Sequence, residues 1–251
     1  MTLEPNDTLE LHIIDKVKEC MDAKPQRDSS RIHASDLKEL RKAYWQRIVP
    51  KSATPAEVGF WLAGLGHHYW MVYSMYGIDD TQEESKYDKG LGIYYSPDLN
   101  SDRGEFKTSR YWQLPNGPLE AADAFKFYER QCRTYAVAEK IDYWNLVVLF
   151  LFPPNEYKQK QPVLKAYTYR FTKKELADER KQIKADVLAL RTALDSQSCS
   201  ELPLCSEGIC FKMVGQGRGK PKKKVPMCKW WEECKPEGRY EVTLDESSSA
   251  T

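Results

Sequence analysis

The sequence predicts an α/β fold in which a mixed β-sheet is flanked by helices. Residues 143–152 form a short, continuous apolar run that ends at two prolines, which is typical of a central strand covered on both faces. Residues 163–171 alternate between apolar and polar side chains, which is typical of a strand nearer an edge. Apolar residues at helical spacing occur at about 120–140 and at 172–194, and the order of these segments predicts helices packed on a sheet.

Composition indicates a soluble globular protein. The chain has 251 residues, of which 41% are hydrophobic and 30% charged, and its net charge is +1, so a nucleic-acid site would require local clustering of basic residues. The longest apolar run, at 146–152, is too short to span a bilayer, and the acidic N-terminus lacks the apolar region of a secretory signal. We therefore expect no membrane association and a cytoplasmic location. There, the seven cysteines favour thiols or metal ligands over disulfides.

Changes in composition predict four regions. The first, 1–30, contains an N-terminal helix at 8–23 and a linker. It is followed by a core at 31–195, a cysteine-rich segment with a basic loop at 196–245, and a disordered tail at 246–251.

A helix is expected at 35–47, because Ser35 and Asp36 precede an apolar-periodic run as helix caps do. Arg41 and Lys42 lie beside aromatic residues in this helix, a combination that suits nucleic-acid contact. The segment alone also fits an ordinary amphipathic helix with a solvated basic face, and by itself favours that interpretation.

A second helix is expected at 56–76, and its apolar character on all sides predicts burial. His67 and His68 are adjacent, so at most one of them is expected to reach a site. Residues 77–89 are polar and acidic and predict a loop.

The next segment, 92–110, predicts a β-hairpin with a tight polar turn at 100–104. Asp98 would lie on its first strand and Glu105 and Lys107 on its second, where alternation directs both side chains to one face.

Two carboxylates and an ammonium would then share a small space. Asp98 and Glu105 would repel each other unless a cation lay between them, so the pattern favours a hard-metal site beside a catalytic lysine. The alternative is a surface salt bridge, which contributes little. Further along, Gln131 and Tyr135 lie four residues apart on one helical face, and alone could be a surface glutamine and a partly buried tyrosine.

Taken in order, these motifs resemble the PD-(D/E)XK nuclease superfamily, and more closely its RecB-like exonucleases, including CRISPR-associated and phage-encoded members. The matching motifs are Ser35-Asp36-Leu37 with Arg41-Lys42-Ala43-Tyr44, Gly64-x-x-x-His68, Pro97-Asp98, Glu105-Phe106-Lys107 and Gln131-x-x-x-Tyr135. The resemblance extends over about residues 32–234 and implies a restriction-endonuclease-like fold.

The resemblance implies a metal-dependent DNA exonuclease that hydrolyses phosphodiester bonds in recombination, repair, or phage or CRISPR DNA processing. Its partners would be single-stranded DNA or duplex ends, and a recombination, CRISPR or phage protein. The alternative is a non-catalytic nucleic-acid-binding module on the same fold.

The resemblance also implies roles for individual residues. Mg²⁺ or Mn²⁺ would be held by Asp98, Glu105 and the carbonyl of Phe106, with His68 joining or supporting them. Lys107 would orient the attacking hydroxide or stabilise charge on the phosphate, and Gln131 and Tyr135 would position the substrate backbone or that water.

Cysteines gather near the C-terminus. Several relatives in the RecB-like group hold an iron–sulfur cluster with one N-terminal and three C-terminal cysteines, but here Leu40 occupies the N-terminal position. A local four-thiolate site for Zn²⁺ or a 4Fe–4S cluster is therefore expected. Its expected ligands are Cys205, Cys210, Cys228 and Cys234. Cys199 could replace Cys205. The alternative is a set of reduced, unligated cysteines.

The glycine-rich basic segment 215–224 lies between these cysteines. Its cations suit contact with DNA phosphates, although a solvated loop is an equal alternative. The expected DNA-binding residues here are Arg218, Lys220, Lys222, Lys223 and Lys224.

Overall fold

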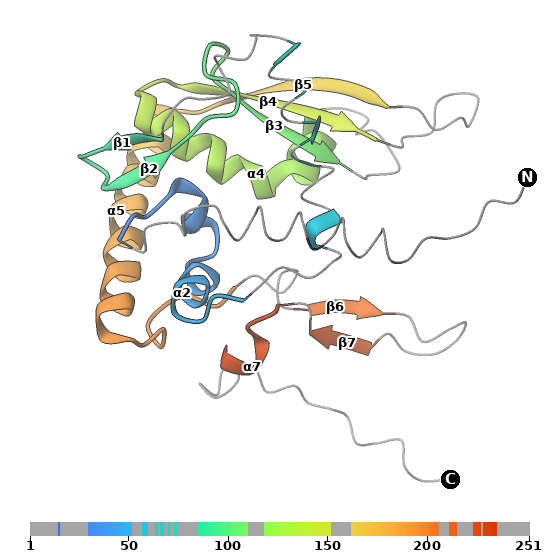
Figure 1. The fold of residues 1–251 in the computed structure, drawn as a ribbon. Helices are drawn as coiled ribbons and strands as arrows, with labels where there is room; N and C mark the ends of the chain where they lie inside the picture. The colour runs from blue at the N-terminus through green and yellow to red at the C-terminus, as the bar shows by residue number, and fades with distance from the viewer. Residues whose placement is uncertain are drawn as a thin grey trace, which may run out of the picture. The chain divides into compact units, whose positions relative to one another are not determined.

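The computed structural model divides the chain into two compact units (Figure 1). The first comprises Met1–Lys38 with Ser52–Leu188, and the second Glu39–Lys51 with Ala189–Thr251. The structure describes residues 15, 30–51, 57–59, 64, 66–67, 70, 73–74, 85–109, 118–151, 162–205, 211–214, 223–226 and 228–234. None of the helices within these ranges is long and apolar enough to cross a membrane.

A mixed three-stranded sheet forms the centre of the first unit. Its strands are β3 (Gly104–Ser109), β4 (Tyr143–Phe150) and β5 (Val163–Arg170), in the order β3-β4-β5. β3 runs parallel to β4, and β5 runs antiparallel to it. Helix α4 (Pro118–Glu139) connects the two parallel strands, as such a pair requires. The expected fold class, the central β4 and the edge strand β5 are confirmed.

Helix α4 packs on one face of this sheet. Its Phe125 ring lies 6.0 Å from that of Phe150, and its Tyr135 ring lies 5.4 Å from that of Trp144. The β4 residues on this face are almost fully buried, namely Trp144, Leu146, Val148 and Phe150. Their neighbours on the other face are only half-buried, so the expectation that β4 is covered on both faces is wrong. Each fully buried side chain of this size contributes about 1.5–3 kcal/mol.

Helix α5 (Lys173–Ser196) follows β5 and confirms the predicted helix. Its start is fixed by a capping box, because Thr172 Oγ1 accepts from the Glu175 amide at 3.2 Å and Glu175 Oε2 accepts from the Thr172 amide at 2.7 Å. Within the first unit, α5 bonds to α4 through buried carboxylates. Glu179 Oε2 accepts from Arg133 Nε at 3.0 Å.

A separate two-stranded ribbon contains β1 (Lys86–Asp88) and β2 (Ile93–Tyr95). The loop expected at 77–89 is therefore wrong for its last part, which forms β1. After β1, Asp88 Oδ1 accepts a hydrogen bond of 2.9 Å from the Leu91 amide and stabilises the turn. The expected hairpin is also corrected, because β2 pairs with β1 rather than with β3.

The tight turn predicted at 100–104 is confirmed. Leu99 and Gly104 form an antiparallel bridge with two backbone hydrogen bonds of 3.0 and 2.9 Å. Arg103 has a positive φ of 50°, which lets the chain reverse before β3 begins. Asp98 consequently lies just before the bridge and not within a strand.

The helix expected at 35–47 is two helices, a 3₁₀ turn η1 (Ala34–Lys38) and α2 (Leu40–Ile48). In a continuous helix, the carbonyl of Leu37 would accept from the amide of residue 41. Here it accepts a hydrogen bond from Arg130 Nη1 of α4. Glu39 is extended between the two helices, with φ −146° and ψ 82°.

The second unit contains α2, the ribbon of β6 (Phe211–Val214) and β7 (Lys223–Pro226), and α7 (Trp231–Cys234). Trp230 Nε1 donates to the carbonyl of Val49 at 2.7 Å, and Lys51 forms an ion pair with Glu233 at 2.5 Å. These contacts attach the C-terminal end of the unit to the residues that follow α2.

The described positions between 57 and 74 are all helical, as predicted. However, Trp70 is 69% exposed and Tyr73 is 56% exposed, so the expected burial is wrong for both side chains. An apolar composition does not determine which sides of a helix find a packing partner. Of the helix predicted at 8–23, only Asp15 is described, and it is helical.

Candidate active site

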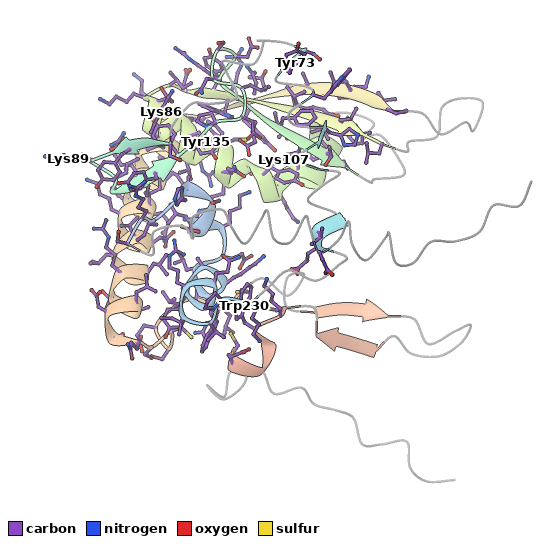
Figure 2. All side chains as sticks on the ribbon, viewed as in Figure 1. Tyr73, Lys86, Lys89, Lys107, Tyr135 and Trp230 are labelled. Atoms are coloured by element: carbon purple, nitrogen blue, oxygen red, sulfur yellow. The ribbon has the colours of Figure 1, made fainter. Side chains whose placement is uncertain are left out.

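Asp98, Glu105 and Lys107 come together at the start of β3. The Lys107 ammonium contacts Glu105 Oε1 and lies 3.5 Å from Asp98 Oδ2. Glu105 and Lys107 pair in register with Leu146 and Val148, so both side chains lie on the α4 face of the sheet. Figure 2 shows Lys107 in this part of the first unit. The structure thus brings the predicted triad together.

The backbone of β3 brings a further polar group to the triad. The amide of Phe106 donates to Asp98 Oδ2 at 3.0 Å. Backbone groups alternate along a strand, and those of Arg103 and Ser109 bond toward β4. The carbonyl of Phe106 therefore lies on the Asp98 side of β3, while its ring is buried on the face opposite Glu105.

Glu105 is the most deeply buried member of the triad. Only 1% of the residue is exposed, and its Oε2 atom is buried without a hydrogen-bond partner among the described residues. Burial, assisted by Asp98, raises the pKa of Glu105 to about 7, although Lys107 and Lys38 act in the opposite direction. For Lys107, burial would lower the pKa, but Glu105 and Asp98 outweigh it and raise the pKa above its ordinary value.

Gln131 and Tyr135 lie on the α4 face that meets Glu105. Gln131 Nε2 donates to Glu105 Oε1 at 2.5 Å and to the Tyr135 hydroxyl at 2.9 Å. That hydroxyl donates in turn to the carbonyl of Ser96, at 3.5 Å, two residues before Asp98. Both α4 side chains are buried, and their hydrogen bonds hold Glu105 and the backbone before Asp98. That they position the substrate backbone or the attacking water stays a prediction. Burial, followed by Glu105, raises the pKa of Tyr135, which therefore stays protonated.

The donor set at this site fits a hard divalent cation. Two carboxylates and a backbone carbonyl are oxygen ligands of the kind that Mg²⁺ prefers. Among the described residues, Glu105 Oε2 also lacks the hydrogen-bond partner that a buried carboxylate oxygen requires. Within the described ranges, no group of three or more His, Cys, Asp or Glu side chains is positioned to hold a metal. A cation here would therefore use Asp98, Glu105 and the Phe106 carbonyl. His68 lies outside the described residues.

Residues that the sequence did not indicate also lie at this site. The Lys38 ammonium lies 5.5 Å from the centre of the Tyr128 ring, and the Lys107 ammonium lies 5.8 Å from it. Cys132 is fully buried beside the triad, where burial first and Glu105 second raise the pKa of its thiol. Lys38 carried no spacing signal, because the predicted continuous helix placed it in an ordinary amphipathic pattern.

The expectation that Arg41 binds DNA is corrected. Arg41 is fully buried within the second unit, where its Nη2 donates at 2.7 Å to the carbonyls of both Cys199 and Leu202. Its guanidinium holds a loop in place and is not presented to a ligand, nor does it form a solvated face. Lys42 is half-buried.

The other expected DNA-binding residues belong to the basic segment 215–224. Lys223 and Lys224 begin β7. Arg218, Lys220 and Lys222 lie outside the described residues, so DNA contact by this group stays a prediction.

The expected four-cysteine site is only partly described. Cys199, Cys205 and Cys234 are buried and Cys228 is half-buried, all in the second unit. Cys210 lies outside the described residues, so the expected cluster and its metal also stay predictions.

Comparison with known proteins gives two solved structures of low similarity. One is the crystal structure of a phage-related exonuclease from Haemophilus somnus 129PT, with 13% identity, a TM-score of 0.44, and coverage of 66% of this chain and 96% of that chain. The other is the crystal structure of SSO0001, with 13% identity, a TM-score of 0.46, and coverage of 80% and 91%. No family model and no curated protein matches.

Proposed function

We propose that this protein is a DNA exonuclease that hydrolyses phosphodiester bonds with the help of Mg²⁺ or Mn²⁺. The observation that carries the proposal is the arrangement of Asp98, Glu105 and Lys107, in which a buried carboxylate oxygen lacks a hydrogen-bond partner among the described residues. A salt-bridged surface turn would not need a fully buried glutamate whose pKa is raised to about 7.

A bound divalent cation would supply an acidic water and neutralise charge on the phosphate. The residues of the chain would position the carboxylates and the attacking water. Gln131 fixes Glu105 Oε1, which leaves Oε2 as the ligand atom. Tyr135, through the carbonyl of Ser96, holds the backbone that precedes Asp98. The Lys107 ammonium, which pairs with both carboxylates, would orient an attacking water and stabilise negative charge on the phosphate.

Activity would be tested with the full-length chain and end-labelled DNA. Single-stranded, linear duplex and covalently closed circular DNA would be incubated with Mg²⁺ or Mn²⁺. We expect degradation of linear DNA, intact circles, and loss of activity by at least about 100-fold in Lys107→Met. The matched control is Lys181→Met, because Lys181 lies on α5 with its side chain 82% exposed.

Two outcomes would contradict the proposal. Undiminished degradation by Lys107→Met would exclude the mechanism. DNA binding without cleavage in any divalent metal would favour the non-catalytic binding module instead.

We further propose that the enzyme acts on DNA in recombination, repair, or phage or CRISPR processing, with a protein partner from one of these systems. The chemistry of the site supports a phosphodiester as the substrate, because a carboxylate pair that could hold a cation beside a lysine suits this group.

A further inference from the structure

Lys38 brings a second ammonium to the site from a different part of the chain. It ends η1, whereas Lys107 belongs to β3, yet each ammonium lies within 6 Å of the centre of the Tyr128 ring. At this distance a lysine is attracted to the ring by a cation–π interaction. Tyr128 lies on α4, three residues before Gln131, so the ring lies beside the residues that hold Glu105.

The backbone that carries Lys38 is anchored. Arg130 of α4 donates to the carbonyl of Leu37, and the same guanidinium pairs with Asp186 and Glu179 of α5. This bond ends the 3₁₀ turn at Lys38, because it occupies the carbonyl that a continuous helix would use. The position of Lys38 is therefore fixed by three elements of the first unit.

Lys38 lies within electrostatic reach of the groups of the site. Lys107, Glu105, Cys132 and Asp98 are the titratable groups that influence it. Lys107 disfavours the charged form of Lys38, whereas Glu105 and Asp98 favour it.

The two ammonium groups repel each other. Burial first and Lys107 second lower the pKa of Lys38 to about 8 in the protein without ligand. An arriving phosphate would offset the repulsion, since its charge favours both ammonium groups.

We propose that Lys38 binds a non-bridging oxygen of the scissile phosphate, while Lys107 contacts the two carboxylates and orients the attacking water. The inference rests on the proposed nuclease function. It adds a substrate-binding residue that arrives from η1, outside the Asp98–Lys107 motif.

The test separates DNA binding from cleavage. Binding of the full-length chain to duplex DNA would be measured in Ca²⁺ over a range of salt concentrations, and cleavage in Mg²⁺, for wild type, Lys38→Met, Lys38→Arg and the control Lys181→Met. We expect Lys38→Met to bind about 10-fold more weakly, with a salt slope smaller by about 0.9, because one phosphate contact is lost. Its kcat should fall by a further ~10–100-fold, and Lys38→Arg should recover most of the binding.

Each result has a distinct meaning. Thermal unfolding would check that Lys38→Met is folded, and if it is not, Lys38→Gln would replace it. If wild type cleaves DNA while folded Lys38→Met keeps the wild-type salt slope and kcat, this inference fails and the proposed function stands. If wild type binds DNA but does not cleave it, the proposed function fails, and the salt slope still decides whether Lys38 contacts phosphate. If wild type does neither, both fail.

Discussion

Gln131 Nε2 donates a hydrogen bond of 2.5 Å to Oε1 of Glu105. It donates a second hydrogen bond to the hydroxyl of Tyr135, which lies one turn further along α4. The first of these bonds, together with Lys107, occupies one oxygen of the Glu105 carboxylate, while the other oxygen is buried without a partner among the described residues. The glutamine therefore orients the side chain that would bind a metal. We therefore expect it to act through Glu105.

Replacing Gln131 with leucine should weaken metal binding. The buried carboxylate would lose the donor that orients it, and loss of such a supporting hydrogen bond typically costs about 10–100-fold in metal affinity or activity. Activity would be measured as a function of Mn²⁺ concentration, with the exposed Gln46→Leu as control. A curve that shifts to higher Mn²⁺ with nearly unchanged maximal rate is expected. A lower maximal rate at unchanged Mn²⁺ dependence would instead favour contact with the substrate.

The raised pKa of Glu105 predicts a pH-dependent stability of the metal-free protein. The carboxyl holds its proton up to about pH 7 when folded, but only to about 4.5 when unfolded, so the folded state binds more protons between these values. Stability from this group is therefore fully present below about pH 4.5 and is lost as pH rises through 7.

Glu105→Gln should remove this dependence, because the amide does not titrate. Relative to wild type, the variant should gain on the order of 1–3 kcal/mol between about pH 5 and pH 8, since one pKa unit corresponds to about 1.36 kcal/mol. Urea unfolding in excess EDTA at both pH values would measure the difference. Parallel pH dependence in the two proteins would show that Glu105 does not titrate in this range.

The sequence predicted β4, β5 and α5 because the apolar run of β4, the alternation in β5 and the helical spacing in α5 are strong local signals. It did not predict that β2 pairs with β1 instead of β3. It also brought Asp98, Glu105 and Lys107 together correctly, since a tight turn and strand alternation are local properties. It missed Lys38 and the break after it, because these depend on Arg130, which is remote in the chain and bonds to Leu37. Periodicity cannot report such a contact between distant residues.

Arg130→Met should destabilise the first unit. The guanidinium pairs with Glu179 and Asp186, which are both nearly buried, and it also satisfies the carbonyl of Leu37. Because Arg130 itself is partly exposed, we expect a loss of about 2–4 kcal/mol in the free energy of unfolding. A double variant with Asp186→Asn should lose less than the sum of the two single changes, as measured by urea unfolding. Additive losses would mean that the pair does not interact.

The cysteine-rich segment is predicted to bind a metal through Cys228 and Cys234 together with cysteines that precede them. Anaerobically purified protein should contain either zinc or iron with sulfide, and an absorption spectrum with metal analysis distinguishes the two. Cys228→Ser should reduce the metal content, whereas Cys132→Ser should not, because Cys132 is buried in the first unit. Metal-free wild-type protein that is folded would contradict the prediction.

Arg41 and Lys42 should differ in their response to the same substitution. Arg41→Met leaves the carbonyls of Cys199 and Leu202 without the donor that reaches both at 2.7 Å, so the free energy of unfolding should fall by about 2–4 kcal/mol. The salt slope of DNA binding should not change, because a fully buried guanidinium cannot contact a phosphate. Lys42→Met should show the reverse, with little effect on stability and a slope smaller by about 0.9, if the half-buried lysine binds DNA as its sequence context predicts.

Arg41→Lys separates charge from geometry, since an ammonium keeps the charge but lacks the guanidinium fork. It should be almost as unstable as Arg41→Met, whereas recovery of full stability would show that charge alone holds this loop.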